Sequence, residues 1–485
     1  MDTRQEDRVP AGRRSPDDTS QPQAPVADVP GPARAVAPAG DQPGADGRAA
    51  LPDPAAHRVL DLAMRVGDAL LSAGMSANDV VVLMLRIARA YGLDRVHVDV
   101  TYTSICASFY PGAGAAPHTS VRVVQLDIVD YTRVRRLDKL CTEIAAGLPI
   151  DEAMARFGRI TSAPRPYPGW LAMLGHAGVG PAVSLLFTTS WKVLLITFLT
   201  ACLVDRLLVG LNRRGVPPFF RQFTAAALIT FVAAAVAGAD ARGVAFFADV
   251  DPSLVVVGGI AMLVAGTMIV GAVQDAIDGF YVTASARVFE VVLRTAGIVA
   301  GIAVALRVVQ EVGATLAIST RPMAHGPLVA QFVGVALTAA FFAIYSYADA
   351  VTVLLAAAMA MLGWLGVMVM SQTDAGVVLA NAIGAVVAAL IASLLVRRTS
   401  VPGFALISAA LLPLFPGLML YNGLLQLVGT VPDTADATAG VSTLFLAFWV
   451  AIGVAAGVSL GTSIGRPIGD RLRGIAFARA ARARR

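Results

Sequence analysis

The chain is poor in charge and in the side chains that carry most enzyme chemistry. Of its 485 residues, 15% are charged, and only 3 are cysteines and 5 are histidines. The only two lysines are Lys139 and Lys192, and neither is followed by the Ser or Thr that ends a glycine-rich phosphate-binding loop. The sequence therefore has no Walker A motif, which excludes ATP hydrolysis by that kind of site.

Metal-binding and hydrolase motifs are also missing. No two histidines stand at the helical spacing typical of metal sites, and no serine lies in a G-x-S-x-G motif. The cysteines, Cys106, Cys141 and Cys202, form no CxxC pair and leave one over in any disulfide scheme, which indicates a reducing compartment for the soluble part. We expect no metal, no cofactor and no enzymatic activity, with a hydrolase in the soluble part as the less favoured alternative.

The first residues lack the apolar core of a signal peptide, so later segments must set the membrane topology. Residues 1–54 are rich in Pro, Ala, Asp and Gly and have almost no large apolar side chains. Such a segment buries too little surface to offset the entropy lost on folding. We predict that residues 1–54 form a disordered tail.

Apolar residues, in contrast, make up 56% of the chain, and its mean hydropathy is +0.69. Ordinary soluble domains contain roughly 45–50% apolar residues. The excess lies beyond Trp170, in runs long enough to cross a hydrocarbon core of about 30 Å, which takes about 20 helical residues. We predict a polytopic α-helical membrane protein with about ten transmembrane helices, at residues 171–189, 192–210, 219–238, 253–273, 288–308, 328–347, 350–369, 375–396, 402–425 and 441–462.

Residues 55–165 have the pattern of a small α/β domain. Apolar residues recur at helical spacing from His57, and Ser76 with Asp79 makes a capping-box-like start to a second helix. Two β-branched, partly alternating runs follow, separated by the turn-rich segment PGAGAAPH, and they predict a hairpin or a sheet edge. A further helix is expected at residues 132–146.

Charged residues divide unevenly between the two sides of the predicted helices. With the N-terminus inside, most loop arginines and the basic tail at residues 466–485 fall on the cytoplasmic side. Attraction to anionic lipid explains this tail better than binding to nucleic acid. We predict a multi-pass protein of the inner cell membrane, with both termini and the α/β domain in the cytoplasm. The other side receives Asp240, Asp249, Asp251, Asp374, Asp433 and Asp436.

The fourth predicted helix, GIAMLVAGTMIVGAVQDAI, can be laid on the ninth, ALLPLFPGLMLYNGLLQLV. This superposition aligns Gly266 with Gly417, each on the fourth helix of a group of five. Because five is odd, the second group enters the membrane from the opposite side. We predict two five-helix inverted repeats at residues 166–310 and 326–465, chance similarity between glycine-rich apolar helices being the alternative.

Ionisable residues near the bilayer are costly, and they are therefore functional candidates. Asp275 and Asp278 follow the fourth helix in the segment QDAIDG. On the fifth helix, Glu290 stands one turn before Arg294, where the two can pair. Interfacial residues that reach water are the alternative, which we favour for Asp205, Asp349 and Arg294.

The ninth predicted helix contains Pro413, Pro416 and Gly417, followed by Asn422. Proline removes a helical hydrogen bond, and freed backbone groups are tolerated at membrane depth only where protein or a water-filled cavity satisfies them. We predict a broken helix that lines a solute pathway, a merely kinked helix being the alternative. In the fourth helix Ala265 stands where a proline would match Pro416, so a break is less clearly predicted there. These patterns alone indicate a secondary transporter for a small polar solute.

Four segments together resemble the threonine/serine exporter family: AGMSANDVVVLMLRIARAYGLDRVHVDVTYTSI, VPPFFRQF, QDAIDGFYVTASAR and LLPLFPG. The resemblance runs from about His57 to Arg466 and departs from the family at Ala265, where members tend to carry proline. It implies export of L-threonine and L-serine, coupled to the proton motive force.

A zwitterionic hydroxy-amino acid needs an anionic or carbonyl partner for its ammonium, N–H donors for its carboxylate and a polar group for its hydroxyl. We expect Asp275 to meet the ammonium or to carry the coupling proton, and backbone groups freed in the fourth and ninth helices to receive the carboxylate. Asn422 or Thr267 is expected to contact the hydroxyl. The candidate residues are Asp275, with Asp278 as its alternate, Gly266, Thr267, Pro416, Gly417, Asn422 and Glu290.

Two other functions stay open at this stage. One is a transporter of another small solute, such as a dicarboxylate or a small peptide. The other is a membrane-anchored sensor or scaffold, although ten helices with intramembrane charges are more than an anchor needs. The expected partners are the amino acid, the coupling proton and the lipid bilayer, and the sequence does not indicate an oligomeric state.

Overall fold

A computed structural model of the chain describes residues 53–112, 116–125, 129–263, 266–312, 325–399, 403–416, 419–420, 422–423, 426 and 437–483. The tail predicted at residues 1–54 lies outside this part, except for its last two residues. Those two residues begin the first helix.

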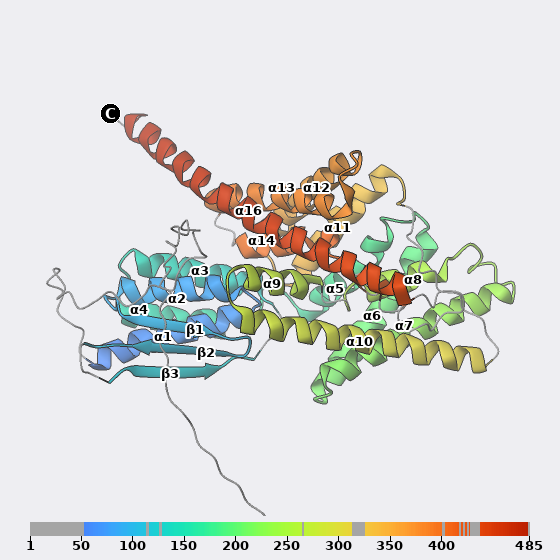
Figure 1. The fold of residues 1–485 in the computed structure, drawn as a ribbon, viewed down its shortest axis with the longest axis horizontal. Helices are drawn as coiled ribbons and strands as arrows, with labels where there is room; N and C mark the ends of the chain where they lie inside the picture. The colour runs from blue at the N-terminus through green and yellow to red at the C-terminus, as the bar shows by residue number, and fades with distance from the viewer. Residues whose placement is uncertain are drawn as a thin grey trace, which may run out of the picture. The chain divides into compact units, whose positions relative to one another are not determined.

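The N-terminal region, residues 53–162, combines helices with a three-stranded antiparallel sheet in the order β1-β2-β3 (Figure 1). The central strand β2 alternates buried and half-buried residues, and its fully buried Ile105 and Ala107 pack against apolar side chains of α1, α2 and α3. The helices are α1 (Asp53–Ser72), α2 (Ala77–Ala90), α3 (Tyr131–Ala145) and α4 (Ile150–Ser162), and the strands are β1 (Val96–Val100), β2 (Ser104–Phe109) and β3 (His118–Val123).

The start of α2 follows the predicted pattern, because the side chain of Ser76 accepts a hydrogen bond from the Asp79 N–H at 3.2 Å. The first β-branched run differs from the prediction, since it forms two strands instead of one. They are joined by a tight turn in which the Thr101 N–H donates to the Ser104 carbonyl at 2.9 Å. Tyr102 therefore lies in this turn, where it faces the helices described below. Helix α4 was not predicted either.

Among the described residues, seven helices are long and apolar enough to cross a membrane, so the chain is a polytopic helical membrane protein. They are α6 (Trp191–Arg213), α7 (Pro218–Ala241), α10 (Tyr281–Glu311), α11 (Leu328–Tyr345), α12 (Ala350–Ser371), α13 (Gly376–Thr399) and α16 (Ala437–Ala483). The other three predicted spans fall on shorter elements, which are α5 (Gly169–Ser184), the pair α8 (Pro252–Ile260) and α9 (Gly266–Ile277), and α14 (Gly403–Ala410) with the short helix η1 (Leu412–Leu414).

The fourth predicted helix is broken even without a proline at Ala265. Helix α8 ends at Ile260, and the Leu263 N–H then donates to the Ile260 carbonyl at 2.8 Å in a tight turn before α9 begins. The preceding Gly258 and Gly259 weaken the helix there, because glycine favours a helix less than almost any other residue.

The ninth predicted helix is broken where its prolines stand. Helix α14 gives way to η1, which contains Pro413, and Phe415 then has an extended conformation with ψ 137°. Pro416 follows as a buried turn residue. The break in this helix agrees with the prediction.

Close packing between helices depends on glycine in two places. Helix α10 packs along α7, where a Cβ on Gly301 would lie 2.2 Å from the Phe223 carbonyl oxygen. Helix α16 packs along α13, where a Cβ on Gly457 would lie 2.4 Å from the Ala382 carbonyl oxygen. Small residues let helix backbones approach closely in a membrane, where dispersion contacts and not burial from water drive association.

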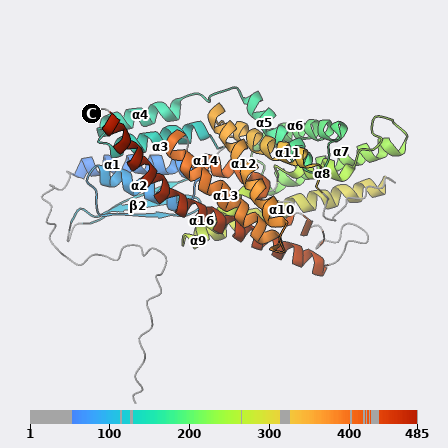
Figure 2. The same cartoon turned by 90° about the horizontal axis from the view of Figure 1, so that it is seen from above.

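Helix α16 continues without interruption to Ala483, over 47 residues (Figures 1 and 2). The tenth predicted span and most of the predicted basic tail at residues 466–485 are therefore parts of one helix. The sequence pattern had separated them because the apolar character ends near Arg466 although the helical backbone does not.

Candidate functional site

Asp275 lies at the end of α9 with none of its surface exposed. Its Oδ1 accepts a hydrogen bond from the Ala77 N–H at 3.1 Å, and its Oδ2 lies 3.2 Å from Nη1 of Arg287. Ala77 is the first residue of α2, where backbone N–H groups have no partner inside the helix and the helix dipole favours a negative charge. The carboxylate thus joins the start of α2 to the membrane helices.

Arg287, on α10, provides the positive charge of this buried pair. Its side chain is 6% exposed, and its Nη2 donates to the Met75 carbonyl at 3.3 Å. The guanidinium lies 5.6 Å from the centre of the Tyr102 ring. Space for it depends on Gly271 of α9, because a Cβ there would come 2.7 Å from Nη1 of Arg287.

Tyr102 extends the contact to the next turn of α10. Its hydroxyl donates to Glu290, which also pairs with Arg294 one turn further along the helix. Burial raises the pKa of Tyr102 above its ordinary value, and the hydrogen bond to the Glu290 carboxylate raises it further. Close by, the Thr283 hydroxyl donates to the Val100 carbonyl at 3.1 Å. We call Tyr102, Asp275, Arg287, Glu290 and Arg294 the docking cluster.

Several buried atoms in and beside the docking cluster have no hydrogen-bond partner among the described residues. Oδ2 of Asp275 is one of them, since its contact with Arg287 is close enough for an ion pair but lacks hydrogen-bond geometry. Buried polar atoms in this state are costly, so they favour binding of a group that supplies the missing bonds. The others are Nε of Arg287, Nε of Arg294, and Nε of Arg221 and Oε1 of Gln222 on α7.

A second contact joins the N-terminal region to the loop between α11 and α12. At the start of α3 the Tyr131 N–H donates to the Ser346 carbonyl at 2.8 Å, and the Thr132 hydroxyl donates to the Tyr347 carbonyl at 2.6 Å. Arg135 pairs with Asp349 at 2.7 Å. The N-terminal region therefore contacts α9 and α10 and also the loop between α11 and α12.

Comparison with known proteins identifies the type of protein to which these features belong. The family described as "Putative threonine/serine exporter" matches residues 61–309, and the family "Threonine/Serine exporter, ThrE" matches residues 331–464. The chain belongs to the threonine/serine exporter family. It is an amino-acid exporter embedded in a membrane.

Two curated relatives agree with this family. A protein of Mycobacterium tuberculosis named "Probable threonine/serine exporter" is 33% identical over 389 residues, which cover 78% of this chain and 72% of the relative. The "Threonine/serine exporter" of Corynebacterium glutamicum is 32% identical over 377 residues, which cover 76% of this chain and 75% of the relative. No solved structure matches the chain.

Two of the candidate residues predicted from the sequence of this exporter meet in the docking cluster. They are Asp275 and Glu290, which Arg287 and Tyr102 connect. Asp278 is exposed in the turn that follows α9. Arg287 and Tyr102 were not candidates from the sequence. The position of Arg287 at the edge of an apolar run could have suggested that it belongs to the site, whereas no pattern in the sequence pointed to Tyr102.

The remaining candidates belong to the two broken helices. Gly266 is the first residue of α9, Pro416 is a buried turn residue, and Asn422 is half-buried in a helical segment. Gly417 and the side chain of Thr267 lie outside the described residues. Apolar side chains of the two broken helices belong to one packed cluster, which includes Val270, Val273, Phe415 and Met419.

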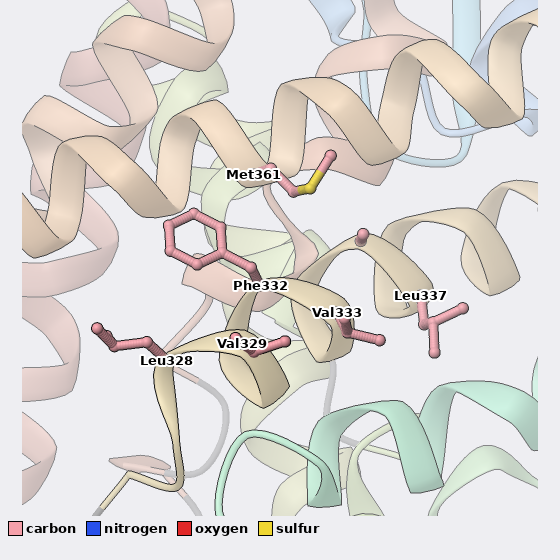
Figure 3. Close-up of a pocket in the computed structure, with 7 residues that line it drawn as sticks. Leu328, Val329, Phe332, Val333, Leu337 and Met361 are labelled. Atoms are coloured by element: carbon pink, nitrogen blue, oxygen red, sulfur yellow. The ribbon is translucent and has the colours of Figure 1, made fainter.

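A groove on the flank of α11 and α12 differs from the docking cluster in chemistry (Figure 3). Its lining is entirely apolar, so it offers no partner to an ammonium, a carboxylate or a hydroxyl. Such a surface suits lipid chains better than a zwitterion. The lining residues are Leu328, Val329, Phe332, Val333, Ala336, Leu337 and Met361.

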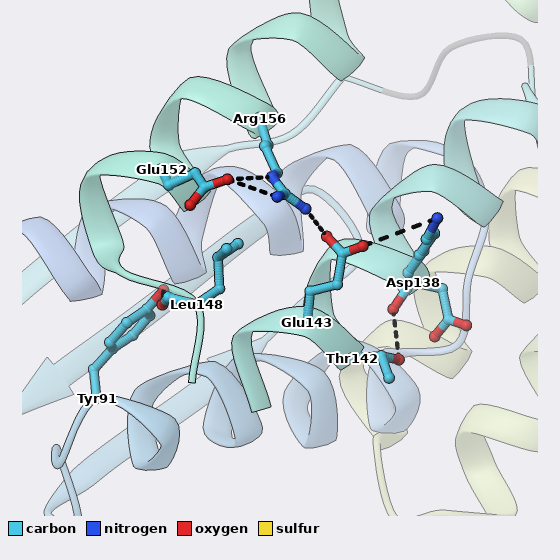
Figure 4. Close-up of polar contacts among 8 residues, drawn as sticks. Tyr91, Asp138, Thr142, Glu143, Leu148, Glu152 and Arg156 are labelled. Atoms are coloured by element: carbon cyan, nitrogen blue, oxygen red, sulfur yellow. Dashed lines mark hydrogen bonds and ion pairs between the residues drawn. The ribbon is translucent and has the colours of Figure 1, made fainter. Parts of the chain in front are cut away.

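Ion pairs in the N-terminal region away from the docking cluster are more exposed (Figure 4). Arg156 of α4 pairs with Glu152 and Glu143 while the three side chains are 34%, 47% and 32% exposed. Solvent screens such pairs, so they contribute little to stability. The pair of Asp275 and Arg287 is much more deeply buried than these pairs, and than the Arg135–Asp349 pair.

Proposed function

We propose that the chain exports L-threonine and L-serine from the cytoplasm, driven by the proton motive force, and that it has no enzymatic activity. The observation that carries this proposal is the docking cluster beside the broken fourth helix. It holds an aspartate and two arginines, each with one buried atom that has no hydrogen-bond partner among the described residues. A free amino acid carries the complementary charges. Both relatives are named as exporters of these two amino acids.

We further propose ten membrane crossings in two inverted five-helix units. The third and fifth helices pack together in each unit, and the fourth is broken in each. The N-terminal region touches two links between helices. At Asp275 it contacts the link between the fourth and fifth helices of the first unit, and at Tyr347 it contacts the link between the first and second helices of the second unit. These two links lie on one side of a membrane only if the second unit is inverted, which supports the repeat. The arginine distribution supports a cytoplasmic location for that side.

For the substrate, we propose that Asp275, with Asp278 as its alternate, receives the ammonium group. Backbone groups near Gly266 and Gly417, together with Arg287 and Arg294, receive the carboxylate. Asn422 or Thr267 contacts the hydroxyl. Because Asp275 has no exposed surface in the docked arrangement, the N-terminal region must move before an amino acid can reach it. We propose that this region is the cytoplasmic gate of the exporter.

Efflux from proteoliposomes tests the proposal. Asp275→Asn removes the negative charge and should reduce driven threonine efflux about thirtyfold or more, because losing one member of a buried charge pair costs about 2–5 kcal/mol. Asp374→Asn is the matched control, since Asp374 is exposed in the turn between α12 and α13. Efflux by Asp275→Asn at the wild-type rate would show that this aspartate has no role in transport.

Two further measurements separate the parts of the proposal. Vesicles loaded in parallel with threonine, serine, a dicarboxylate or a dipeptide should lose only the two hydroxy-amino acids rapidly. Residues up to 165 can be deleted to test whether the N-terminal region is a gate. If it is, the shortened protein should either export no threonine or export it at a rate that does not depend on the proton gradient. Undiminished, gradient-dependent efflux would reduce this region to a stabilising role.

A further inference from the structure

His176 and Asp205 form a second buried pair of ionisable side chains, between α5 and α6. Only 8% and 7% of their surfaces are exposed. Nδ1 of His176 lies 3.2 Å from Oδ1 of Asp205, which is within ion-pair distance but outside hydrogen-bond geometry. This nitrogen has no other hydrogen-bond partner among the described residues. Ionisable groups buried among membrane helices are costly, so such a pair is a candidate for a functional role.

Arg206 and Tyr345 each contact one member of this pair. The other oxygen of Asp205, Oδ2, accepts a hydrogen bond from Nε of Arg206 at 3.0 Å, and the Arg206 side chain is 57% exposed. From α11 the Tyr345 ring lies 5.0 Å from the imidazole ring, measured between centres. Helix α8, which also packs on α5, has no ionisable residue. The other ionisable groups that act on Asp205 or Tyr345 are Cys202, Arg165, Arg294 and Tyr347.

The pair lies near the depth of the break between α8 and α9. Gly180 of α5 meets α8 at Gly258, where a Cβ on Gly180 would lie 2.8 Å from the Gly258 carbonyl oxygen. On α5, His176 precedes Gly180 by four residues, which is about 6 Å along the helix axis. His176 therefore lies closer than Gly180 to the N-terminal region. The break follows Ile260, about 3 Å beyond Gly258 in the same direction. A proton held at His176 is therefore placed to influence the broken helix.

We propose that His176 takes up and releases the proton that drives export, with Asp205 as its counter-ion. This inference rests on the proposed function, and it separates the coupling proton from the ammonium site at Asp275. A proton arriving from the outside adds to the imidazole nitrogen and forms an imidazolium opposite the Asp205 carboxylate. The same proton leaves to the cytoplasm and restores the neutral ring, so that one proton enters for each one released.

The charges of His176, Asp205 and Arg206 suit this cycle. With neutral His176, the negative charge of Asp205 is balanced by Arg206. With protonated His176, the group carries one net positive charge, and Asp205 at 3.2 Å offsets the cost of burying the imidazolium. Histidine is the side chain whose ordinary pKa lies near neutrality, which suits it to take up a proton on one side of a membrane and release it on the other.

The test uses the full chain in proteoliposomes and compares two assays of threonine movement. One is efflux with and without an acid-outside pH gradient, and the other is exchange at uniform pH, in which no net proton moves. In the wild type the gradient should accelerate efflux several-fold. In His176→Gln the ratio of the two efflux rates should fall to one, while exchange continues.

His325→Gln is the matched control. His325 is exposed and stacks on Phe187 before the start of α11, so its replacement should leave the wild-type ratio unchanged. Asp205→Asn gives a second readout, the pH dependence of the gradient response, which would not change if Asp205 only stabilised the fold. Because the imidazolium then lacks its counter-ion, the pH at which the gradient response is half-maximal should shift to lower values.

Three outcomes overturn the inference. His176→Gln could keep the wild-type ratio, Asp205→Asn could leave the midpoint unchanged or raise it, or both variants could lose exchange together with driven efflux. A wild-type protein that ignores the pH gradient would instead refute the proposed proton coupling itself. A wild-type response that His176→Gln shares would refute only the role given to His176.

Discussion

Replacing Arg287 by methionine tests whether the buried ion pair holds the N-terminal region on the membrane helices. The substitution keeps an apolar side chain of similar length but leaves the Asp275 carboxylate buried without its positive partner. Both side chains are almost completely buried, so solvent screens the pair little. Breaking such a pair costs about 3–5 kcal/mol. Since 1.4 kcal/mol is a factor of ten, the contact should open about a hundredfold to several thousandfold more often.

Hydrogen exchange at the Ala77 amide measures this opening directly. Ala77 is the first residue of α2, so its N–H has no acceptor within the helix, and its partner is Oδ1 of Asp275 at 3.1 Å. Exchange at this amide therefore requires the contact to open. We expect Arg287→Met to accelerate it by the factor given above, as read by mass spectrometry of a peptide that contains Ala77.

Arg156→Met provides the control, because Arg156 belongs to a solvent-exposed ion-pair network in the same region (Figure 4). Its replacement should leave exchange at Ala77 unchanged. If Arg287→Met exchanges at the wild-type rate while the membrane helices stay folded, the ion pair does not hold the docked arrangement.

Three further results are expected. Gly271→Ala should weaken docking in the same exchange assay, because its Cβ would lie 2.7 Å from the Arg287 guanidinium; an unchanged rate would show that the arginine relaxes freely. Gly301→Ala should destabilise the protein by about 1–3 kcal/mol and lower its melting temperature, since its Cβ would meet backbone of α7, whereas Gly210→Ala has open space and should not. Burial raises the pKa of the Cys141 thiol to about 12, so it stays protonated at neutral pH. Maleimide, which needs the thiolate, should therefore label half-buried Cys106 first, and equal labelling rates would contradict the packing of α3.

Local features of the fold were readable from the sequence because they depend on neighbouring residues. Apolar runs of membrane-spanning length predicted the long helices, and the cap of α2 at Ser76 followed from residues three positions apart. The break in the ninth predicted helix followed from its prolines. The break in the fourth was less clear because Ala265 replaces the proline, and Gly258 and Gly259 carry a weaker signal.

The environment of charged residues was predicted less well. Asp205 was expected to reach water at a helix end, but it is buried against His176 of the adjacent helix. The sequence shows that Asp205 follows an apolar run and does not show which residues of α5 face it. Whether a charge near a membrane boundary is solvated or buried depends on the rotation and tilt of its helix, which neighbouring helices set.

The sequence by itself determined that this chain is a polytopic helical membrane protein with glycine- and proline-interrupted segments, since chain length and hydrophobicity decide what can cross a bilayer. It also selected Asp275 as a candidate. Only the tertiary structure decided what Asp275 touches, because its partner Ala77 lies 198 residues away in the chain. A buried carboxylate must find hydrogen-bond donors as well as a counter-charge wherever folding brings them, and such contacts are a property of the packed helices and not of the local pattern.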